Sequence, residues 1–218
     1  MKRALISLSL AATLSFALST AQAATVVVLD ASDAWNNPQV NLAQTTDLSG
    51  GTWVGAGASV RAGNDDGDFR SPFDPSGGNN PPPNWEQLAY FAVGPTNPLN
   101  PATLDFDTAQ KSLTFLWGSV DDYNTLEFLD DLGVVVLTVT SATLVGEQGG
   151  GVGASLVSVT DILFHGLRFT SIPSNAFEFS NIVTTPVPIP PALVLFGSAL
   201  AGLGYLMRRR RETGPQPA

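Results

Sequence analysis

Alternation of apolar and polar residues with a period of two is the feature that most restricts the fold of this chain. It recurs between residues 24 and 185, where Gly, Pro, Asn and Asp interrupt it at short intervals. A helix would show apolar residues at spacings of three and four, and that spacing is hard to find here. Period-two alternation places successive side chains on opposite faces of a strand. We therefore expect an all-β ectodomain over 24–185, an antiparallel β-sandwich of jelly-roll-like type.

The clearest strand pair is expected between residues 104 and 117. Leu104 and Phe106 alternate with two aspartates, and residues 113–117 alternate in the same way. The polar residues 108–110 lie between the two runs, as a turn would. This pattern predicts a hairpin with one face in the core.

Further strands are expected on both sides of this hairpin. Glycine loosens the strand expected at 52–60, and the continuous apolar run at 134–140 predicts a more fully buried strand. The single histidine, His165, lies in an apolar run and is interpreted as a strand residue, not a catalyst. The expected strands outside the hairpin are 25–29, 52–60, 88–93, 126–128, 134–140, 162–170 and 177–179.

The C-terminal tail, residues 186–218, combines three features in one order. A proline box at 187–191 is followed by an apolar run over 190–207 and then by the arginine cluster 208–211. At the helical rise, this apolar run reaches roughly 27 Å, close to the roughly 30 Å hydrocarbon core of a bilayer. Arginines beside such a segment hold that end in the cytoplasm. We expect one transmembrane helix, with the bulk of the chain outside. The membrane-stop residues are Arg208, Arg209, Arg210 and Arg211.

This tail resembles the PEP-CTERM sorting signals of Gram-negative bacteria, in which a Pro-rich box, a short transmembrane helix and an Arg cluster are recognised by a membrane-embedded exosortase. The family's box is usually Val-Pro-Glu-Pro, and Ile189 stands here in the place of Glu. The resemblance implies sorting and cleavage by an exosortase-type enzyme, and the alternative is a permanent single-pass anchor. Two internal stretches, 117–128 and 176–182, look like motifs of one group of exosortase-dependent surface proteins. The sorting motif is Val187, Pro188, Ile189 and Pro190.

The first 23 residues are predicted to be a secretory signal peptide. A basic start and an apolar middle precede Ala21 and Ala23, which form a small-x-small cleavage site. Cleavage after Ala23 leaves a mature chain that begins at Ala24. We expect an exported protein that passes through the inner membrane to the cell surface or the extracellular matrix.

The chain between the two signals is strongly acidic. It holds four basic and eighteen acidic residues, a net charge of −14. Such a surface repels nucleic acid and anionic lipid, and favours solubility or divalent cations. The chain has no cysteine, which excludes disulfide and thiolate chemistry. We therefore expect no nucleic-acid partner.

Two acidic turns are the candidate metal-ligating sites, and Ca²⁺ is the only cofactor they suggest. The first surrounds a glycine within the Gly/Pro/Asn-rich insertion 61–84, and clustered oxygens suit a hard cation. It lacks the EF-hand spacing. A solvated acidic loop and ordinary turn chemistry are the alternatives. The candidate ligands are Asp65, Asp66 and Asp68 in the first turn, and Asp121, Asp122 and Asn124 in the second.

No enzyme motif accompanies these features: the chain lacks a Gly-x-Ser-x-Gly elbow, a phosphate-binding loop and paired histidines. We expect a non-catalytic protein of the cell surface or of the exopolysaccharide matrix of a biofilm. A carbohydrate-binding module on the same scaffold is the alternative, and a secreted hydrolase that uses an acid pair is the third. An exposed strip made of Trp35, Trp53, Trp85 and Tyr123 would favour carbohydrate binding.

Overall fold

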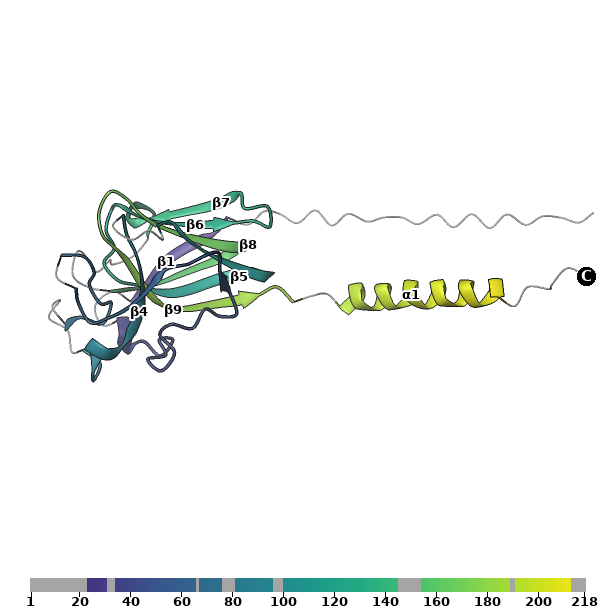
Figure 1. The fold of residues 1–218 in the computed structure, drawn as a ribbon, viewed down its shortest axis with the longest axis horizontal. Coiled ribbons are helices and arrows are strands. Elements are labelled where there is room, and N and C mark those ends of the chain that lie inside the picture. Colours follow the sequence, from purple (N-terminus) through teal and green to yellow (C-terminus); the bar gives the residue numbers. More distant parts are fainter. Residues whose placement is uncertain are drawn as a thin grey trace, which may run out of the picture.

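The computed structural model describes residues 23–30, 34–65, 67–75, 81–95, 100–144, 154–188 and 191–212. These residues form a mostly antiparallel β-sheet and one helix, so the all-β expectation is confirmed for them (Figure 1). The strands are β1 (Thr25–Asp30), β2 (Thr52–Trp53), β3 (Ser59–Ala62), β4 (Ala89–Val93), β5 (Ala102–Trp117), β6 (Asn124–Leu129), β7 (Val135–Thr140), β8 (Ser155–Ser171) and β9 (Phe177–Pro186). Short 3-10 helices cover Ala34–Asn36, Trp85–Gln87 and Ser141–Thr143.

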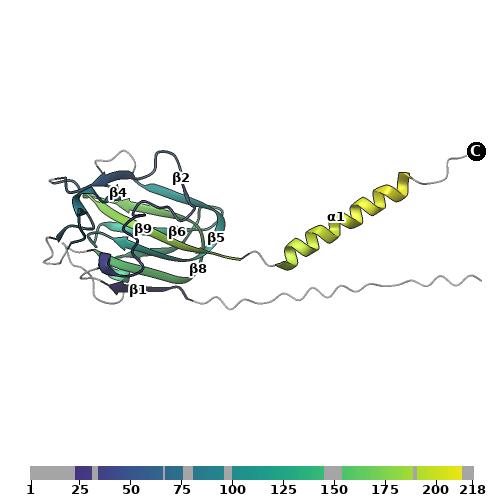
Figure 2. The ribbon, with the colours of Figure 1, turned by 90° about the horizontal axis from the view of Figure 1, so that it is seen from below.

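The two longest strands, β5 and β8, form the centre of the sheet. They pair antiparallel from Ala102 opposite Phe169 to Trp117 opposite Ser155. Their register shifts between Asp105 and Ser112, and such bulges bend a strand pair. The first half of β5 also pairs with β2, and its second half pairs with β9. The β5–β8 pair therefore has further strands paired to it along its length. Figure 2 shows β1, which pairs with β8, and β2, which pairs with β5, at opposite sides of the domain.

Aromatic rings fill the space between the two halves. Phe169 of β8 stacks on Phe179 of β9 with ring centroids 4.0 Å apart. Trp53 of β2 meets Phe91 of β4 edge to face at 5.3 Å. The three phenylalanines belong to the main hydrophobic cluster, and Trp53 packs against it. Such aromatic pairs stabilise the folded state by about 0.5–1.5 kcal/mol each beyond the effect of their buried area. Ring contacts therefore help to hold the strands of the bent sheet together.

The hairpin expected between residues 104 and 117 does not form. The residues expected to turn, 108–110, continue β5 as one extended strand. Gln110 pairs with Phe164 of β8 on one side and with Pro186 of β9 on the other. The successive polar residues therefore mark the bulged part of a long strand, because paired neighbours on both sides keep the backbone extended.

The strand expected at 52–60 divides into β2 and β3. Gly55 and Gly57 lie between them with φ of +69°, a conformation that suits glycine. A Cβ at Gly57 would collide with the indole of Trp53, so the chain turns tightly over that ring.

The run expected to be the most fully buried strand, β7, lies instead at an edge of the sheet. Among the described strands it pairs only with β6. Val139 is fully buried, but Val135 is 38% and Val136 is 47% exposed. The prediction of a more fully buried strand was wrong, because an apolar run does not reveal whether a second strand covers its outer edge.

The insertion 61–84 packs against a second hydrophobic cluster. Phe69 and Phe73 are buried there with Trp35 and Tyr90. The described residues of the insertion beyond β3 therefore cover one face of the sheet, mostly as turns and irregular backbone.

The two ends of the β-domain lie in one row of the sheet. Thr25 of β1 is opposite Thr160 of β8, and Thr160 is opposite Ser112 of β5. Ser112 is in turn opposite Thr185 of β9. Three strand spacings separate Thr25 from Thr185, roughly 14 Å at about 4.8 Å each. The first strand therefore starts and the last strand ends on the same side of the domain (Figure 1).

A single α-helix is described, α1 (Pro191–Glu212), and it contains most of the apolar run expected at 190–207 together with arginines 208–211. It begins at a proline. The first N–H groups of a helix have no intrahelical acceptor, so the lack of an N–H on proline removes no hydrogen bond at this position. Leu195 and Phe196 are exposed on it, at 69% and 64%. Within the described ranges, no helix reaches the length and hydropathy of a membrane span.

Several predicted features fall outside the described residues. Residues 1–22 of the predicted signal peptide lie outside the described ranges. Ala23 is described and exposed, and Ala24 directly precedes β1. Val187 of the sorting motif donates its backbone N–H to the carbonyl of Ala109 at 2.8 Å. Ala21, Ile189 and Pro190 lie outside the described ranges.

Candidate functional site

A polar cavity of about 250 Å³ lies where β9 begins. Three segments line it besides β9: the insertion 61–84, the turn 118–123 between β5 and β6, and residues 175–176 before β9. The fold therefore brings together two acidic turns that lie about fifty residues apart in the sequence. Their contributions to the lining are Asp65 and Asp68 from the first turn and Asp121 from the second.

The other predicted metal ligands do not line this cavity. Asp122 is exposed elsewhere in the turn, and Asp66 lies outside the described residues. Asn124 is fully buried and donates its amide to the carbonyls of Ser119 and Ala176, at 3.3 and 3.0 Å. In the part of the chain that the structure describes, no three His, Cys, Asp or Glu side chains form a group that could hold a metal ion. The Ca²⁺ site therefore stays a prediction.

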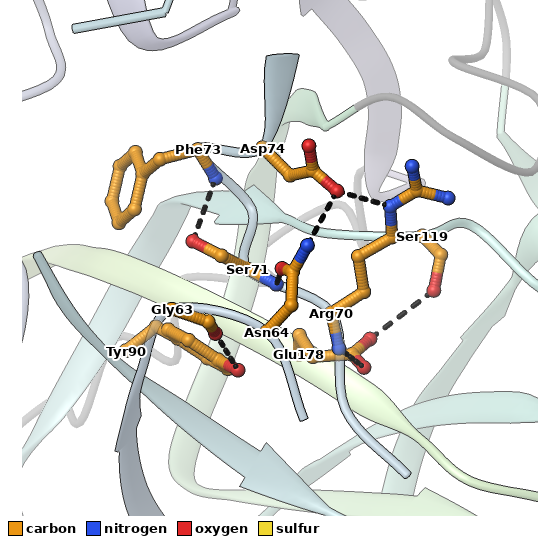
Figure 3. A network of polar contacts seen from close by, with 9 residues as sticks. All are labelled: Gly63, Asn64, Arg70, Ser71, Phe73, Asp74, Tyr90, Ser119 and Glu178. Carbon is orange, nitrogen blue, oxygen red and sulfur yellow. Dashed lines mark hydrogen bonds and ion pairs between the residues drawn. The ribbon is translucent and has the colours of Figure 1, made fainter. Parts of the chain in front are cut away.

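Glu178 in the wall of the cavity is the residue that sequence reasoning missed. Its side chain is buried, with 2% of the residue exposed. One carboxyl oxygen, Oε1, accepts the backbone N–H of Arg70 at 2.8 Å, and the other accepts the hydroxyl of Ser119 at 3.1 Å (Figure 3). Its backbone carbonyl accepts the N–H of Gly118 at 2.7 Å. One residue of β9 thus holds both loops that shape the cavity.

Burial raises the pKa of Glu178 to about 8, and the negative charge of Asp121 adds to the rise. The hydrogen bonds from Arg70 and Ser119 act in the opposite direction but do not outweigh burial. The carboxyl is therefore mostly protonated at neutral pH, which avoids leaving an unpaired charge in the protein interior.

Alternation along β9 explains why Glu178 escaped notice. Phe177 and Phe179 flank it, and both belong to the main core, so an isolated strand would point Glu178 toward water. The structure buries all three, because the insertion covers the other face of β9 at this position. The only sequence signal was the length of the insertion, which gave no indication of what it covers.

A second set of polar contacts closes the insertion on itself. The carboxylate of Asp74 accepts hydrogen bonds from Arg70 Nε at 2.7 Å and from Asn64 Nδ2 at 2.9 Å. Asn64 Oδ1 accepts the backbone N–H of Ser71 at 2.9 Å (Figure 3). Asp74 is itself buried, so its ion pair with Arg70 fixes the residue whose N–H binds Glu178.

Tyr123 connects the opposite wall of the cavity. Its hydroxyl donates to the carbonyl of Asn175 at 2.9 Å, and the Asn175 amide donates to Asp68 Oδ1 at 2.8 Å. Burial raises the pKa of Tyr123 to about 12, and the adjacent Asp121 contributes. The phenol therefore stays protonated at any physiological pH and remains a hydrogen-bond donor.

The tryptophans do not form an exposed strip. Trp35 is buried in the second cluster, Trp85 packs against that cluster, and Trp53 packs against the main core. Of the four aromatic residues considered, Tyr123 is the one that lines the acidic cavity. His165 lies in β8, as predicted, beside a separate small pocket.

No known family model matches this chain, and no curated protein matches it. Among solved structures, it is similar to the enzymatically active domain of tailspike protein 4 from bacteriophage CBA120, with a TM-score of 0.30 and 13% sequence identity. The match covers 65% of this chain and 20% of that chain, so this chain spans about a fifth of the length of that structure. A likeness at this TM-score carries no argument about fold or activity.

Proposed function

We propose that this chain is an exported, non-catalytic β-sandwich protein of the cell surface or exopolysaccharide matrix, sorted and cleaved at its tail by an exosortase-type enzyme. The observation that carries the proposal is the position of the two domain ends. Thr25, which follows the predicted signal peptide, and Thr185, which precedes the proline box, lie in one row of the sheet. Both export segments therefore leave from one end, and the domain can fold while the membrane holds either segment.

The position of the cavity supports a role at the surface. Glu178 is the second residue of β9 and Pro186 is the last. The eight residue steps between them span roughly 26 Å of extended strand. The acidic cavity therefore lies at the end of β9 away from the tail, which supports exposure of the cavity in a protein held by its tail, and the acidic charge of the domain favours a hydrated surrounding.

The contacts of Glu178 support a non-catalytic role. A general acid must approach the reacting atom to hydrogen-bond distance. Glu178 is 2% exposed, and both of its oxygens already accept hydrogen bonds from neighbouring loops. Its chemistry is therefore directed to holding the loops together.

The membrane step of the proposal depends on the sequence pattern of the tail alone, so the experiment tests it directly. The full chain is produced in a Gram-negative host with and without an exosortase-type enzyme, and surface protein is examined by mass spectrometry. We expect surface molecules to end near Pro191 only in the host that has the enzyme. Intact peptides from 208–211 on most surface molecules would refute cleavage and support the permanent anchor.

Carbohydrate binding is the second candidate, favoured by one observation. Tyr123 lines the cavity next to Asp68, Asp121 and Asn175, a set of donors and acceptors suited to sugar hydroxyls. The experiment is calorimetric titration of the full chain with neutral oligosaccharides. Binding that is lost in Asp121→Asn but kept in Asp122→Asn, whose site lies outside the cavity lining, would establish this function.

A further inference from the structure

A second cavity, of about 220 Å³, lies between β9 and the segment 37–51, which precedes β2. It shares no lining residue with the acidic cavity. Its lining holds three amide side chains, one hydroxyl and one carboxylate, together with two apolar residues of β9, Ile182 and Val183. Among the described residues of this lining, none is basic. The cavity is therefore polar but close to neutral.

A bulge in β9 lies beside this cavity. Thr114 of β5 is opposite Val183 and Leu116 is opposite Ser180, so one residue of β5 faces two residues of β9. Asn181 in the bulge has φ of +53°, a left-handed conformation that is uncommon outside glycine. Bulges of this kind re-aim side chains at binding sites. The strand keeps an unfavourable backbone conformation here, which calls for a reason in the surrounding structure.

The bulge changes which side chain of β9 faces outward. Phe177 and Phe179 are buried in the main core, so uninterrupted alternation would place Val183 there as well. The extra residue places Ile182 in the core instead. Val183 is left 50% exposed in the lining of the cavity. The bulge thus gives a polar cavity an apolar floor, the combination typical of small-molecule sites.

Hydrogen bonds to β9 hold the opposite wall of the cavity in place. The backbone N–H of Asn181 donates to the carbonyl of Thr45 at 2.9 Å, and its side-chain amide donates to the carbonyl of Asn41 at 2.8 Å. Ser49 Oγ accepts the backbone N–H of Thr184 at 2.9 Å. The cavity is therefore preformed, and a ligand does not have to order its walls.

Two exposed side chains of this wall keep polar atoms for a ligand. Gln44 Oε1 accepts Asn41 Nδ2 at 2.7 Å, so Gln44 can offer its amide N–H groups. Asp47 Oδ1 accepts the backbone N–H of Ser49 at 2.7 Å, so Asp47 can offer its second oxygen. Donors and an acceptor beside an apolar floor match a sugar ring, whose hydroxyls both donate and accept hydrogen bonds.

We propose that this cavity binds one neutral sugar unit of a polysaccharide, with Val183 beneath the C–H face of the ring and Gln44 and Asp47 at its hydroxyls. The inference rests on the proposed surface role, which brings polysaccharide into contact with the domain. An anionic ligand would meet one carboxylate and no counter-charge in this lining. Ligand sites for drug-sized molecules measure about 300–1,000 Å³, so this smaller cavity suits a single ring.

The experiment is an NMR titration of the isotope-labelled full chain in a detergent without a sugar head group. Cellobiose, maltose and diacetylchitobiose are the neutral probes, and digalacturonic acid is the acidic control. We expect at least one neutral probe to shift the amide signals of Gln44 and Val183 to saturation, with a dissociation constant on the order of 1 mM. The acidic control should bind at least about tenfold more weakly.

Variants decide which contacts bind the sugar. Gln44→Ala removes the donor, and Val183→Thr puts a hydroxyl on the apolar floor while keeping a branched strand residue, so each should weaken binding by about tenfold. The matched control is Gln39→Ala, at an exposed glutamine of the same segment outside the lining. This control and Asp121→Asn, in the acidic cavity, should bind as wild type does.

Four results would overturn the proposal. They are no saturable shift with any neutral probe, equally tight binding of digalacturonic acid, equal weakening by Gln39→Ala and Gln44→Ala, or loss of binding in Asp121→Asn, which would place the sugar in the acidic cavity. Cleavage of the tail does not enter the titration. A negative titration therefore leaves export and cleavage standing, and failure of cleavage in the mass-spectrometric experiment leaves this site standing.

Discussion

Replacement of the buried acid by its amide, Glu178→Gln, should change how the stability of the domain depends on pH. The ordinary pKa of the carboxyl is 4.5, and burial raises it to about 8 in the folded protein. Between these values the folded chain holds a proton that the unfolded chain has released. The free energy of unfolding therefore falls as pH rises from 4.5 to 8. Outside that interval, Glu178 makes no further contribution to its pH dependence.

The size of the effect follows from that interval. Each pH unit is equivalent to about 1.4 kcal/mol, so the interval sets an upper bound of about 5 kcal/mol on the stability lost between pH 4.5 and 8. Local relaxation and water entry reduce this figure, and we expect a loss of about 2–4 kcal/mol. Glutamine does not ionise, keeps an oxygen for the Arg70 N–H, and can donate to the Ser119 hydroxyl. The variant should thus equal wild type near pH 5 and exceed it by those 2–4 kcal/mol at pH 8.5.

Urea unfolding at several pH values measures this difference, followed by the fluorescence of the buried Trp35 and Trp117. The matched control is Glu127→Gln, which removes a partly exposed ion pair with Arg168 between neighbouring strands. Exposed pairs contribute about 0–1 kcal/mol, so the control should retain the pH profile of wild type. A Glu178→Gln profile parallel to that of wild type between pH 5 and 8.5 would show that the reasoning from burial is wrong.

Three further predictions test other parts of the chain. Gly118→Ala should lower the free energy of unfolding by about 1–3 kcal/mol in urea titration, because its Cβ would lie 2.9 Å from the Cβ of Glu178 and 3.0 Å from its carbonyl oxygen. Replacement of arginines 208–211 by glutamine should release unprocessed protein into periplasm or medium, measured by fractionation, and unchanged retention would show that the helix alone suffices. Submillimolar Ca²⁺ should raise the melting temperature more than NaCl of equal ionic strength, an effect lost in Asp68→Asn or Asp121→Asn. Identical melting in the two salts would remove the metal hypothesis.

The sequence predicted strands well where apolar and polar residues alternate. Residues 126–128 and 177–179 both lie in strands close to their expected positions, although both faces of β9 are covered at 177–179. The prediction failed where a neighbouring strand determines the backbone. Residues 108–110 are polar enough for a turn, but pairing with β8 and β9 keeps them extended. Register with distant strands is not encoded in a local pattern.

The site was predicted only in pieces. The sequence singled out Asp65, Asp68 and Asp121 but assigned them to separate turns, since nothing in the spacing indicated that the insertion lies beside the turn at 118–123. It also could not identify Glu178 as buried. That burial requires a cover over the second face of β9, and the cover comes from residues about a hundred positions earlier in the chain.

The burial of Glu178 also determines which parts of the domain unfold together. Its carboxyl binds the insertion through the Arg70 N–H and the turn through Ser119, while its backbone carbonyl binds Gly118. The ionised carboxylate is penalised by burial, so pH above its pKa favours opening of the two loops that cover it, and both loops are walls of the same cavity. The start of β1 and the end of β9 lie at the other end of the sheet and share none of these contacts. Alkaline pH should consequently loosen the cavity end of the sheet first and leave the end that holds Thr25 and Thr185 intact. Amide hydrogen exchange at pH 7 and 9, corrected for the intrinsic rate, should show loss of protection at Gly118 and Arg70 before loss at Ser112. Equal loss at all three sites would mean that the domain opens as one unit.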